Sequence, residues 1–291
     1  MYFELSLHRP NKDLRLLLEY ELIWTFDQTI TFTSFVGSAE SCVHRRFRQL
    51  LELATALRVF ASGTMAENLD DRTLDEVSNS FWANQGASYP NYGTTKKRRL
   101  HEINYLMSQF SALNLDSVRV LVDVGCGTGS TVTILQELTD IEHYFCYDIS
   151  MGMMSIIDTR SVRGAQVTTS ELDISSLDPD FEFPDADIVL CFGLFQCLSD
   201  EAVRTVLSRL RGKRLFVRDA CYLPHQGRQD INTFSEQLRA KYSCRYRTLL
   251  EYISLCTSSD WQLKDVRRAF PDEIESAFDT KQWFLHLERT K

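Results

Sequence analysis

The sequence lacks several patterns that mark particular classes of protein. Its eight cysteines form no C-x-x-C pair and no cysteine–histidine cluster with zinc spacing, so we expect no metal site and a reducing, cytoplasmic setting. No apolar run approaches the ~20 residues that cross a bilayer. The first residues also lack the basic-then-apolar layout of a signal peptide. These absences predict a soluble, cytoplasmic protein with no membrane partner.

The chain also lacks an excess of positive charge, internal repeats and low-complexity tracts. It has 32 Lys and Arg residues against 40 Asp and Glu residues, for a net charge of −8. This balance disfavours charge-driven binding of nucleic acids. A hydrophobic content of 44% and a length of 291 residues are typical of a globular protein with one large domain, or a core domain with an extension.

A glycine-rich turn between a strand and a helix is the most informative feature. Val118 to Val124 is apolar enough for a short buried strand, and glycines follow at 125, 127 and 129. A helical apolar period begins at Val132. Glycines let a backbone approach a ligand closely, and a helix start presents free N–H groups and partial positive charge. The stretch therefore predicts a nucleotide-type binding site.

The spacing of this turn narrows the choice of ligand. A dinucleotide fingerprint reads G-x-G-x-x-G, whereas this turn reads G-x-G-x-G with Asp123 two residues before the first glycine. The stretch Val122-Asp123-Val124-Gly125-Cys126-Gly127-Thr128-Gly129 resembles the first motif of the class I S-adenosylmethionine-dependent methyltransferases. Taken alone, it leaves a chance glycine-rich turn or a nicotinamide site as alternatives, so the downstream segments decide.

Downstream of this motif, strands and helices alternate as in a doubly wound α/β sheet. We expect strands at 118–124, 143–147, 165–169, 186–192, 214–218, 261–266 and 282–287, and helices from 150, at 201–210, 231–242 and 247–256. The last two strands are expected to pair as an antiparallel hairpin. The resemblance covers residues 80–291 and implies an α/β, Rossmann-like fold with a seven-stranded, mostly parallel sheet.

The segments before and within this core suggest a division into parts. Residues 1–78 are predicted to be an N-terminal extension, mainly helical, with an amphipathic helix at 42–60 and a connector at 67–76. Residues 79–291 form the predicted methyltransferase domain. Within it, 79–116 is a lid and leading helix, and 221–246 is a substrate-side insertion. The apolar face of the leading helix is predicted to comprise Leu100, Ile103, Leu106, Met107, Phe110 and Leu113.

The resemblance implies where the cofactor S-adenosylmethionine, and its product S-adenosylhomocysteine, would bind. Asp148 ends the second strand and would accept from the ribose hydroxyls, although it could also cap the next helix. Met153 would pack on adenine or belong to the core. The implied cofactor-binding residues are Asp123, Gly125, Cys126, Gly127, Gly129, Asp148, Ile149, Met153, Asp173, Ile174, Gly193 and Leu194.

The segment after the fourth strand departs from the family pattern. Gln196 and Cys197 stand where family members often carry histidines, so a histidine base is absent there. Methyl transfer depends mostly on positioning, and a base helps chiefly when the acceptor is a hydroxyl. Candidate bases are Asp219, His225 and His101. An ion pair with Arg218 is the structural alternative for Asp219.

The acceptor is predicted to be a small molecule, methylated on oxygen or nitrogen. The predicted substrate-binding residues are aromatic or polar: Trp82, Tyr89, Tyr92, Arg98, Gln196 and Tyr222. Aromatic faces suit sugars or rings, and basic side chains suit a phosphate. Methylation of a protein and a catalytically inactive S-adenosylmethionine-binding scaffold remain alternatives. The fourth strand lacks the N/D-P-P-Y/F tetrapeptide of base-methylating members, which further disfavours nucleic acid. A homodimer is left open.

Overall fold

The computed structural model describes residues 70–85, 96–112, 118–157, 163–222, 227–235, 240–275 and 280–290. The predicted helix at 42–60 and three predicted site residues, Tyr89, Tyr92 and His225, lie outside these ranges. The division at residue 78 stays a prediction. The helix α2 (Asp71–Ala83) runs across that position.

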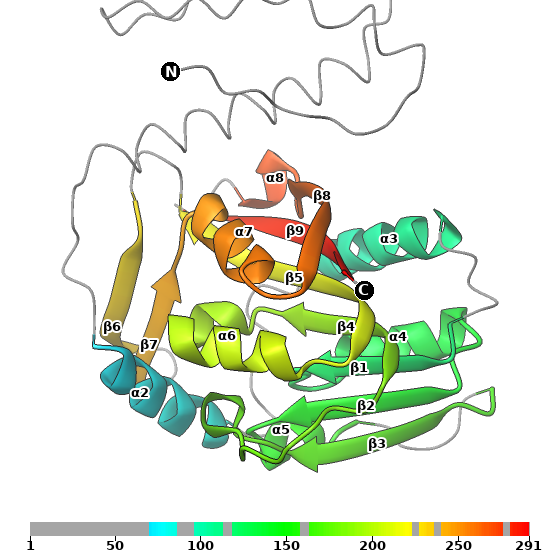
Figure 1. The fold of residues 1–291 in the computed structure, drawn as a ribbon, viewed down its shortest axis with the longest axis horizontal. Helices are drawn as coiled ribbons and strands as arrows, with labels where there is room; N and C mark the ends of the chain where they lie inside the picture. Colours follow the sequence, from blue (N-terminus) through cyan, green and yellow to red (C-terminus); the bar gives the residue numbers. More distant parts are fainter. Residues whose placement is uncertain are drawn as a thin grey trace, which may run out of the picture. The chain divides into compact units, whose positions relative to one another are not determined.

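A seven-stranded sheet forms the centre of the described part of the chain, as predicted (Figure 1). Its strands lie in the order β3-β2-β1-β4-β5-β9-β8. Their bounds are Val120–Val124 (β1), His143–Asp148 (β2), Gln166–Glu171 (β3), Ala186–Phe192 (β4), Gly212–Tyr222 (β5), Trp261–Arg268 (β8) and Thr280–Arg289 (β9).

The pairing of these strands explains why some of them read as continuous apolar runs. Strands β3, β2, β1, β4 and β5 pair parallel with one another, so helices can cover both faces of this region. Strand β9 pairs antiparallel with both β5 and β8, which confirms the predicted closing hairpin. The order reverses between β1 and β4, and ligands bind beside such a switch point in open α/β sheets.

Helices pack on the two faces of the sheet and bury two separate apolar clusters. On one face α6 (Asp200–Arg209) and α7 (Leu249–Thr257) contribute to a cluster with β4 and β5. On the other face lie α3 (Lys96–Ala112) and α4 (Ser130–Leu138). Shorter helices are α5 (Met151–Met154), α8 (Asp272–Glu275) and the 3₁₀ turns η3 (Ile174–Ser176) and η4 (Phe195–Cys197). Among the helices described, none is long and apolar enough to span a bilayer.

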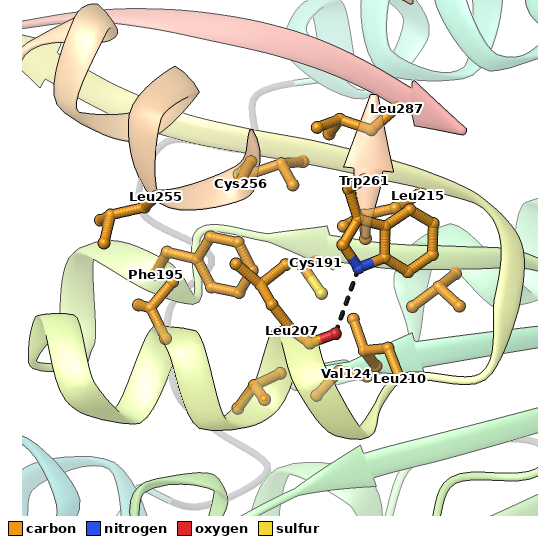
Figure 2. Packing of buried hydrophobic residues seen from close by; sticks show 14 of the residues in the cluster. Val124, Cys191, Phe195, Leu207, Leu210, Leu215, Leu255, Cys256, Trp261 and Leu287 are labelled. Carbon is orange, nitrogen blue, oxygen red and sulfur yellow. Dashed lines mark hydrogen bonds between the residues drawn. The ribbon is translucent and has the colours of Figure 1, made fainter. Parts of the chain in front are cut away.

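The indole of Trp261 fixes the antiparallel end of the sheet to α6 (Figure 2). Trp261 starts β8 and is 2% exposed. Its Nε1 donates to the carbonyl oxygen of Leu207, 3.1 Å away, within a cluster that includes Leu215 and Leu287. A buried indole N–H normally finds such a partner. The closing hairpin is therefore packed into the core rather than appended to it.

The predicted helix at 231–242 is wrong. The segment forms a hairpin of β6 (Gln229–Ser235) and β7 (Ala240–Tyr246), which pair antiparallel as a separate two-stranded sheet. Asp230 lies directly opposite Arg245, and Arg245 Nε is 2.8 Å from Asp230 Oδ1 with both side chains buried. Opposite charges paired across strands stabilise a hairpin, and this partnership is invisible to helical periodicity.

The connector predicted at 67–76 is also wrong from Asp71 onward, because α2 begins there. Asp70 caps this helix, with its carboxylate accepting from the Thr73 amide at 3.2 Å. Leu74, Ser78 and Phe81 form its buried face, and α2 packs against β7. The acidic composition of the first turns is what a helix N-terminus favours.

The apolar face of α3 is shorter than predicted. Ile103, Leu106 and Phe110 are buried as expected, whereas Leu100 is 59% exposed. In the first two turns of α3, the side chains of Arg98 and Glu102 are buried, with 6% and 0% exposure. Charged residues thus occupy the inward positions where this helix approaches the carboxyl ends of the strands.

Candidate functional site

A cavity of about 270 Å³ lies at the carboxyl ends of β1, β2, β4 and β5. Side chains from α2 and α3 and from the turns that follow these strands surround it. The described lining residues are Ser78, Asn79, Trp82, Arg98, Arg99, Asp123, Gly125, Cys126, Gly127, Thr128, Ser130, Thr131, Asp148, Ile149, Met153, Ile174, Phe192, Gly193, Leu194, Gln196, Cys197, Leu198, Arg218 and Gln282.

The turn after β1 is built from glycines in left-handed backbone conformations. Gly125, Gly127 and Gly129 have φ angles of +74°, +54° and +65°, which residues with a Cβ rarely adopt. The Gly125 and Cys126 amides both donate to the carbonyl oxygen of Tyr147, at 2.8 and 3.1 Å. The turn is thereby fixed against the end of β2. Gly129 precedes α4 without a side-chain cap, which leaves the helix start open to a ligand.

These three glycines face different surroundings. A Cβ on Gly129 would lie 2.6 Å from Ile157 Cγ1, and a Cβ on Gly125 would lie 3.1 Å from Leu194 Cδ1. A Cβ on Gly127 would come no closer than 3.9 Å to a heavy atom, the Cε of Met153. Gly129 is therefore required by packing, and it does not line the cavity, whereas Gly127 does.

Asp148 binds the glycine turn through its carboxylate. Its Oδ2 accepts from the Gly127 amide at 2.7 Å, and its Oδ1 accepts from the Ser150 amide at 2.9 Å. The predicted alternative, capping of the next helix, falls to another residue: Ser150 caps α5 by accepting from the Met153 amide. Burial raises the pKa of Asp148, and the amide donors oppose this. Asp148 is thus available at the cavity wall.

A second carboxyl group lies close to Asp148 at the floor of the cavity. Asp123 is 4% exposed. Burial, and then the nearby Asp148 charge, raise the pKa of Asp123 to about 7, against the attraction of Arg99. An acid with this pKa exchanges its proton near neutral pH. The electrostatics of the site therefore vary in the physiological range.

The turn after β4 brings Gly193 and Leu194 to the opposite wall. Gly193 has a φ of +73°, and its amide donates to the Arg218 carbonyl at 2.6 Å. Asp219 lies behind this turn and accepts from the Phe195 and Gln196 amides, at 3.2 and 3.4 Å. Asp219 is 1% exposed and is not among the lining residues. It supports the loop at 194–198, and burial raises its pKa to about 7.

A cluster of two arginines around one glutamate forms a third wall, which the sequence did not reveal. Glu102 is fully buried. Its carboxylate forms ion pairs with Arg99 Nη1, at 2.9 Å, and with Arg218 Nε, at 3.0 Å. Arg99 also donates to the Thr131 hydroxyl at 2.7 Å. The only sequence signal is the i, i+3 spacing of Arg99 and Glu102. Arg218 comes from another strand.

The two cofactor-binding residues predicted after β3 differ in position. Ile174 lines the cavity, whereas Asp173 does not. The Asp173 carboxylate accepts from Asn79 Nδ2 at 3.1 and 3.2 Å and from the Ser175 amide at 2.9 Å. Asn79 lies on α2 and itself lines the cavity. Its role was missed because α2 was not predicted there.

The remaining predicted residues fall inside or outside this cavity. Trp82, Arg98 and Gln196, predicted for substrate, line it, as do the predicted cofactor residues Cys126, Ile149 and Met153. Tyr222 does not; its ring packs on Tyr246, with the centroids 5.5 Å apart. His101 is exposed on α3 and also lies outside the lining. The functional roles of all these residues remain predictions.

Comparisons with known proteins agree with this architecture. Residues 122–215, about a third of the chain, match a family model described as a methyltransferase domain. A malonyl-[acyl-carrier protein] O-methyltransferase from Brevibacillus brevis is 24% identical over 75 residues, which is 26% of each chain. The match thus spans about a quarter of the curated relative's length.

Solved structures extend the likeness over most of the chain. One is a 1,6-didemethyltoxoflavin-N1-methyltransferase from Burkholderia thailandensis, with its substrate and S-adenosylhomocysteine bound. It has a TM-score of 0.57 and 15% identity, over 78% of this chain and 94% of that one. A second, a SAM-dependent methyltransferase from Leishmania major, has a TM-score of 0.56 and 11% identity, over 80% and 91% of the two chains. At such identities the likeness concerns the fold.

The sequence motif, the family match and the fold all indicate a methyltransferase. The glycine turn of residues 125–129 and Asp148 lie within the matched segment and meet at one cavity of the sheet. Residues 122–215 therefore match a methyltransferase domain, and the described part of the chain has the fold of solved S-adenosylmethionine-dependent methyltransferases.

Proposed function

We propose that this protein transfers a methyl group from S-adenosylmethionine to an oxygen or nitrogen atom of a small-molecule acceptor. The observation that carries the proposal is the meeting of Gly127 and Asp148 at the cavity wall, where the Asp148 carboxylate accepts from the Gly127 amide at 2.7 Å. Proteins of the same fold include enzymes that are named for small-molecule substrates, such as the Burkholderia 1,6-didemethyltoxoflavin-N1-methyltransferase.

The described residues fit the cofactor. Space remains above Gly127, where a Cβ would reach into the cavity and meet only Met153 within 4 Å. The uncapped start of α4 offers amides for the carboxylate of the methionine portion. Asp148 would hold the ribose hydroxyls, and Ile174 and Met153 would contact the adenine. When bound, S-adenosylmethionine supplies an electrophilic methyl group, whose transfer leaves S-adenosylhomocysteine.

In this proposal the protein accelerates methyl transfer mainly by positioning the acceptor and the cofactor. The turn at Gly193 and Leu194, supported from behind by Asp219, would hold the acceptor side of the cavity in place. Trp82 on α2 would exclude water from the opposite side. Orientation and exclusion of water supply much of the rate for an already activated methyl group. We assign no general base among the described residues, because Asp219 and His101 lie outside the cavity lining.

Calorimetry with S-adenosylmethionine and an assay for S-adenosylhomocysteine formation test the proposal. We expect wild type to bind the cofactor and Asp148→Asn to bind it roughly 10- to 100-fold more weakly, the range for hydrogen bonds to a charged group. Asp180→Asn, which changes an exposed acid, is the matched control. Absence of binding by wild type, or equal affinity in wild type and Asp148→Asn, would overturn the proposal.

A further inference from the structure

Two side-chain nitrogens lie close to the space above the turn at Gly193. A Cβ built on Gly193 would lie 3.8 Å from Arg218 Nη2 and 4.0 Å from Gln196 Nε2. All three residues line the cavity. Gly193 directly follows β4, Gln196 belongs to the η4 turn, and Arg218 lies within β5. A ligand atom above this glycine therefore meets an amide and a guanidinium together.

An ion pair of Nε and a hydrogen bond of Nη1 fix the orientation of the Arg218 guanidinium. Its Nε lies 3.0 Å from Glu102 Oε1, and its Nη1 donates to Gln282 Oε1. The guanidinium carbon lies 5.4 Å from the centroid of the Phe192 ring. Within the described part of the chain, neither Arg218 Nη2 nor Gln196 Nε2 has a hydrogen-bond partner. A pre-oriented donor with nothing to donate to is suited to a ligand.

The charge balance beside these donors favours an anion. Arg99 and Arg218 share the single buried carboxylate of Glu102, so this cluster carries an unbalanced positive charge. Arg98 also lines the cavity, and the acids that line it are Asp123 and Asp148. Asp148 keeps its negative charge, which its hydrogen bonds from the Gly127 and Ser150 amides stabilise, whereas burial disfavours the charged form of Asp123. The remaining positive charge of the arginine cluster lies beside Gly193, on Arg218.

We propose that Arg218 and Gln196 form the binding site for a carboxylate group of the methyl acceptor. Two N–H donors within about 4 Å of one point can each donate to one oxygen of a planar carboxylate, and one spare guanidinium charge matches a monoanion. The inference rests on the proposed methyltransferase function and names its substrate class. It makes Arg218 a specificity-determining residue, with its orientation set by Glu102 and Gln282.

Binding of matched probes to the full-length protein, loaded with S-adenosylhomocysteine, tests this site. The probes are benzoate, benzamide and phenyl phosphate, each followed by calorimetry or ligand-observed NMR. We expect benzoate to bind more tightly than benzamide or phenyl phosphate. Gln196→Glu places a negative charge beside Arg218 while Arg99, Glu102 and Arg218 themselves are unchanged, and should weaken benzoate roughly tenfold or more while leaving benzamide unchanged.

Further variants separate recognition from folding. Arg218→Met should lose the preference for benzoate. Arg218→Lys keeps the positive charge but lacks the paired N–H donors of a guanidinium, so it should retain part of the preference. Arg204→Met, at an exposed position on α6, should behave as wild type. Affinity for S-adenosylhomocysteine reports whether each variant keeps its fold. A protein that binds S-adenosylhomocysteine but does not prefer the acid, or whose preference survives in Gln196→Glu, overturns the carboxylate site. A wild type that does not bind S-adenosylhomocysteine overturns the proposed function first.

Discussion

Arg247 Nη1 donates a 2.5 Å hydrogen bond to the carbonyl oxygen of Phe195, in the loop that follows β4. Its Nη2 donates to the Leu198 carbonyl at 2.7 Å, and its Nε donates to Asp200 at 2.8 Å. Arg247 is completely buried. One guanidinium thus satisfies two backbone acceptors and one carboxylate at the wall of the cavity, and it joins the β7–α7 connection to that wall.

We predict that Arg247→Met destabilises the protein by about 3–5 kcal/mol, the range for removing one partner of a buried ion pair. The substitution leaves two loop carbonyls without their donor and Asp200 without its closest buried cation. Urea unfolding of wild type and variant measures the change. Arg204→Met removes an exposed arginine and should change the free energy of unfolding by less than about 0.5 kcal/mol. A similar small change for Arg247→Met would contradict the packing role.

The glycines of the first turn allow stability and binding to be separated. Gly129→Ala would bring a Cβ to 2.6 Å from Ile157, so we expect a loss of stability of roughly 2 kcal/mol or more from strain and overpacking. Gly127→Ala meets no atom closer than 3.9 Å. It should cost only the roughly 1–2 kcal/mol of a left-handed backbone, yet it should weaken cofactor binding because its methyl group enters the cavity.

Denaturant unfolding and calorimetry with S-adenosylhomocysteine, run on both variants, check this contrast. We expect Gly129→Ala to lose more stability than Gly127→Ala. Relative to the stability that each variant loses, Gly127→Ala should lose more affinity for S-adenosylhomocysteine. The reverse pattern would show that the cavity side of the turn has been misassigned.

The buried carboxyl of Asp219 gives stability a defined pH dependence. Burial raises its pKa to about 7, whereas an exposed aspartic acid titrates near pKa ~3.9. Between about pH 4 and 7 the folded protein keeps a proton that the unfolded chain releases, so the free energy of unfolding falls as pH rises. The fall approaches roughly 4 kcal/mol for one such group, and it ends above about pH 7.

Comparison with Asp219→Asn isolates this effect, because asparagine does not titrate and Asp123 is present in both proteins. We expect the stability of wild type relative to the variant to be greatest near pH 4 and to decline toward pH 7. Urea unfolding at several pH values measures it, with Asp180→Asn as the exposed control. Parallel curves for wild type and Asp219→Asn would mean that the carboxyl does not retain its proton.

The features that the sequence predicted are those set by nearby residues. The turn at 125–129 and Asp148 follow buried strands at fixed spacing, so a local pattern located both. The seven strands were also predicted, because β4 and its neighbours are apolar wherever helices cover both faces. These signals require no knowledge of partners elsewhere in the chain.

The features that the sequence did not predict depend on distant partners. The hairpin β6–β7 contains Arg245, which pairs with Asp230 and also with Asp71, 174 residues away. The cluster of Arg99, Glu102 and Arg218 likewise joins α3 to β5. Periodicity cannot report pairs of charges that become buried only after the sheet has formed. A helix was therefore predicted in place of a hairpin, and the cluster of Arg99, Glu102 and Arg218 was not predicted.

Asn79 connects α2 to the turn at η3, and this contact provides the last test. Asn79 Nδ2 donates to both Asp173 oxygens, at 3.1 and 3.2 Å, and to the Ser175 hydroxyl at 2.6 Å. Because α2 carries Trp82 at the cavity wall, we predict that Asn79→Ala loosens α2 and weakens cofactor binding by roughly 5- to 30-fold, as the loss of about 1–2 kcal/mol implies. Ser80→Ala, on the exposed side of the same helix, is the control. Hydrogen exchange should show faster exchange of α2 amides in Asn79→Ala than in Ser80→Ala, while exchange in β1 and β4 stays unchanged. Equal protection of α2 in both variants, together with unaltered affinity, would show that the helix is held without this contact.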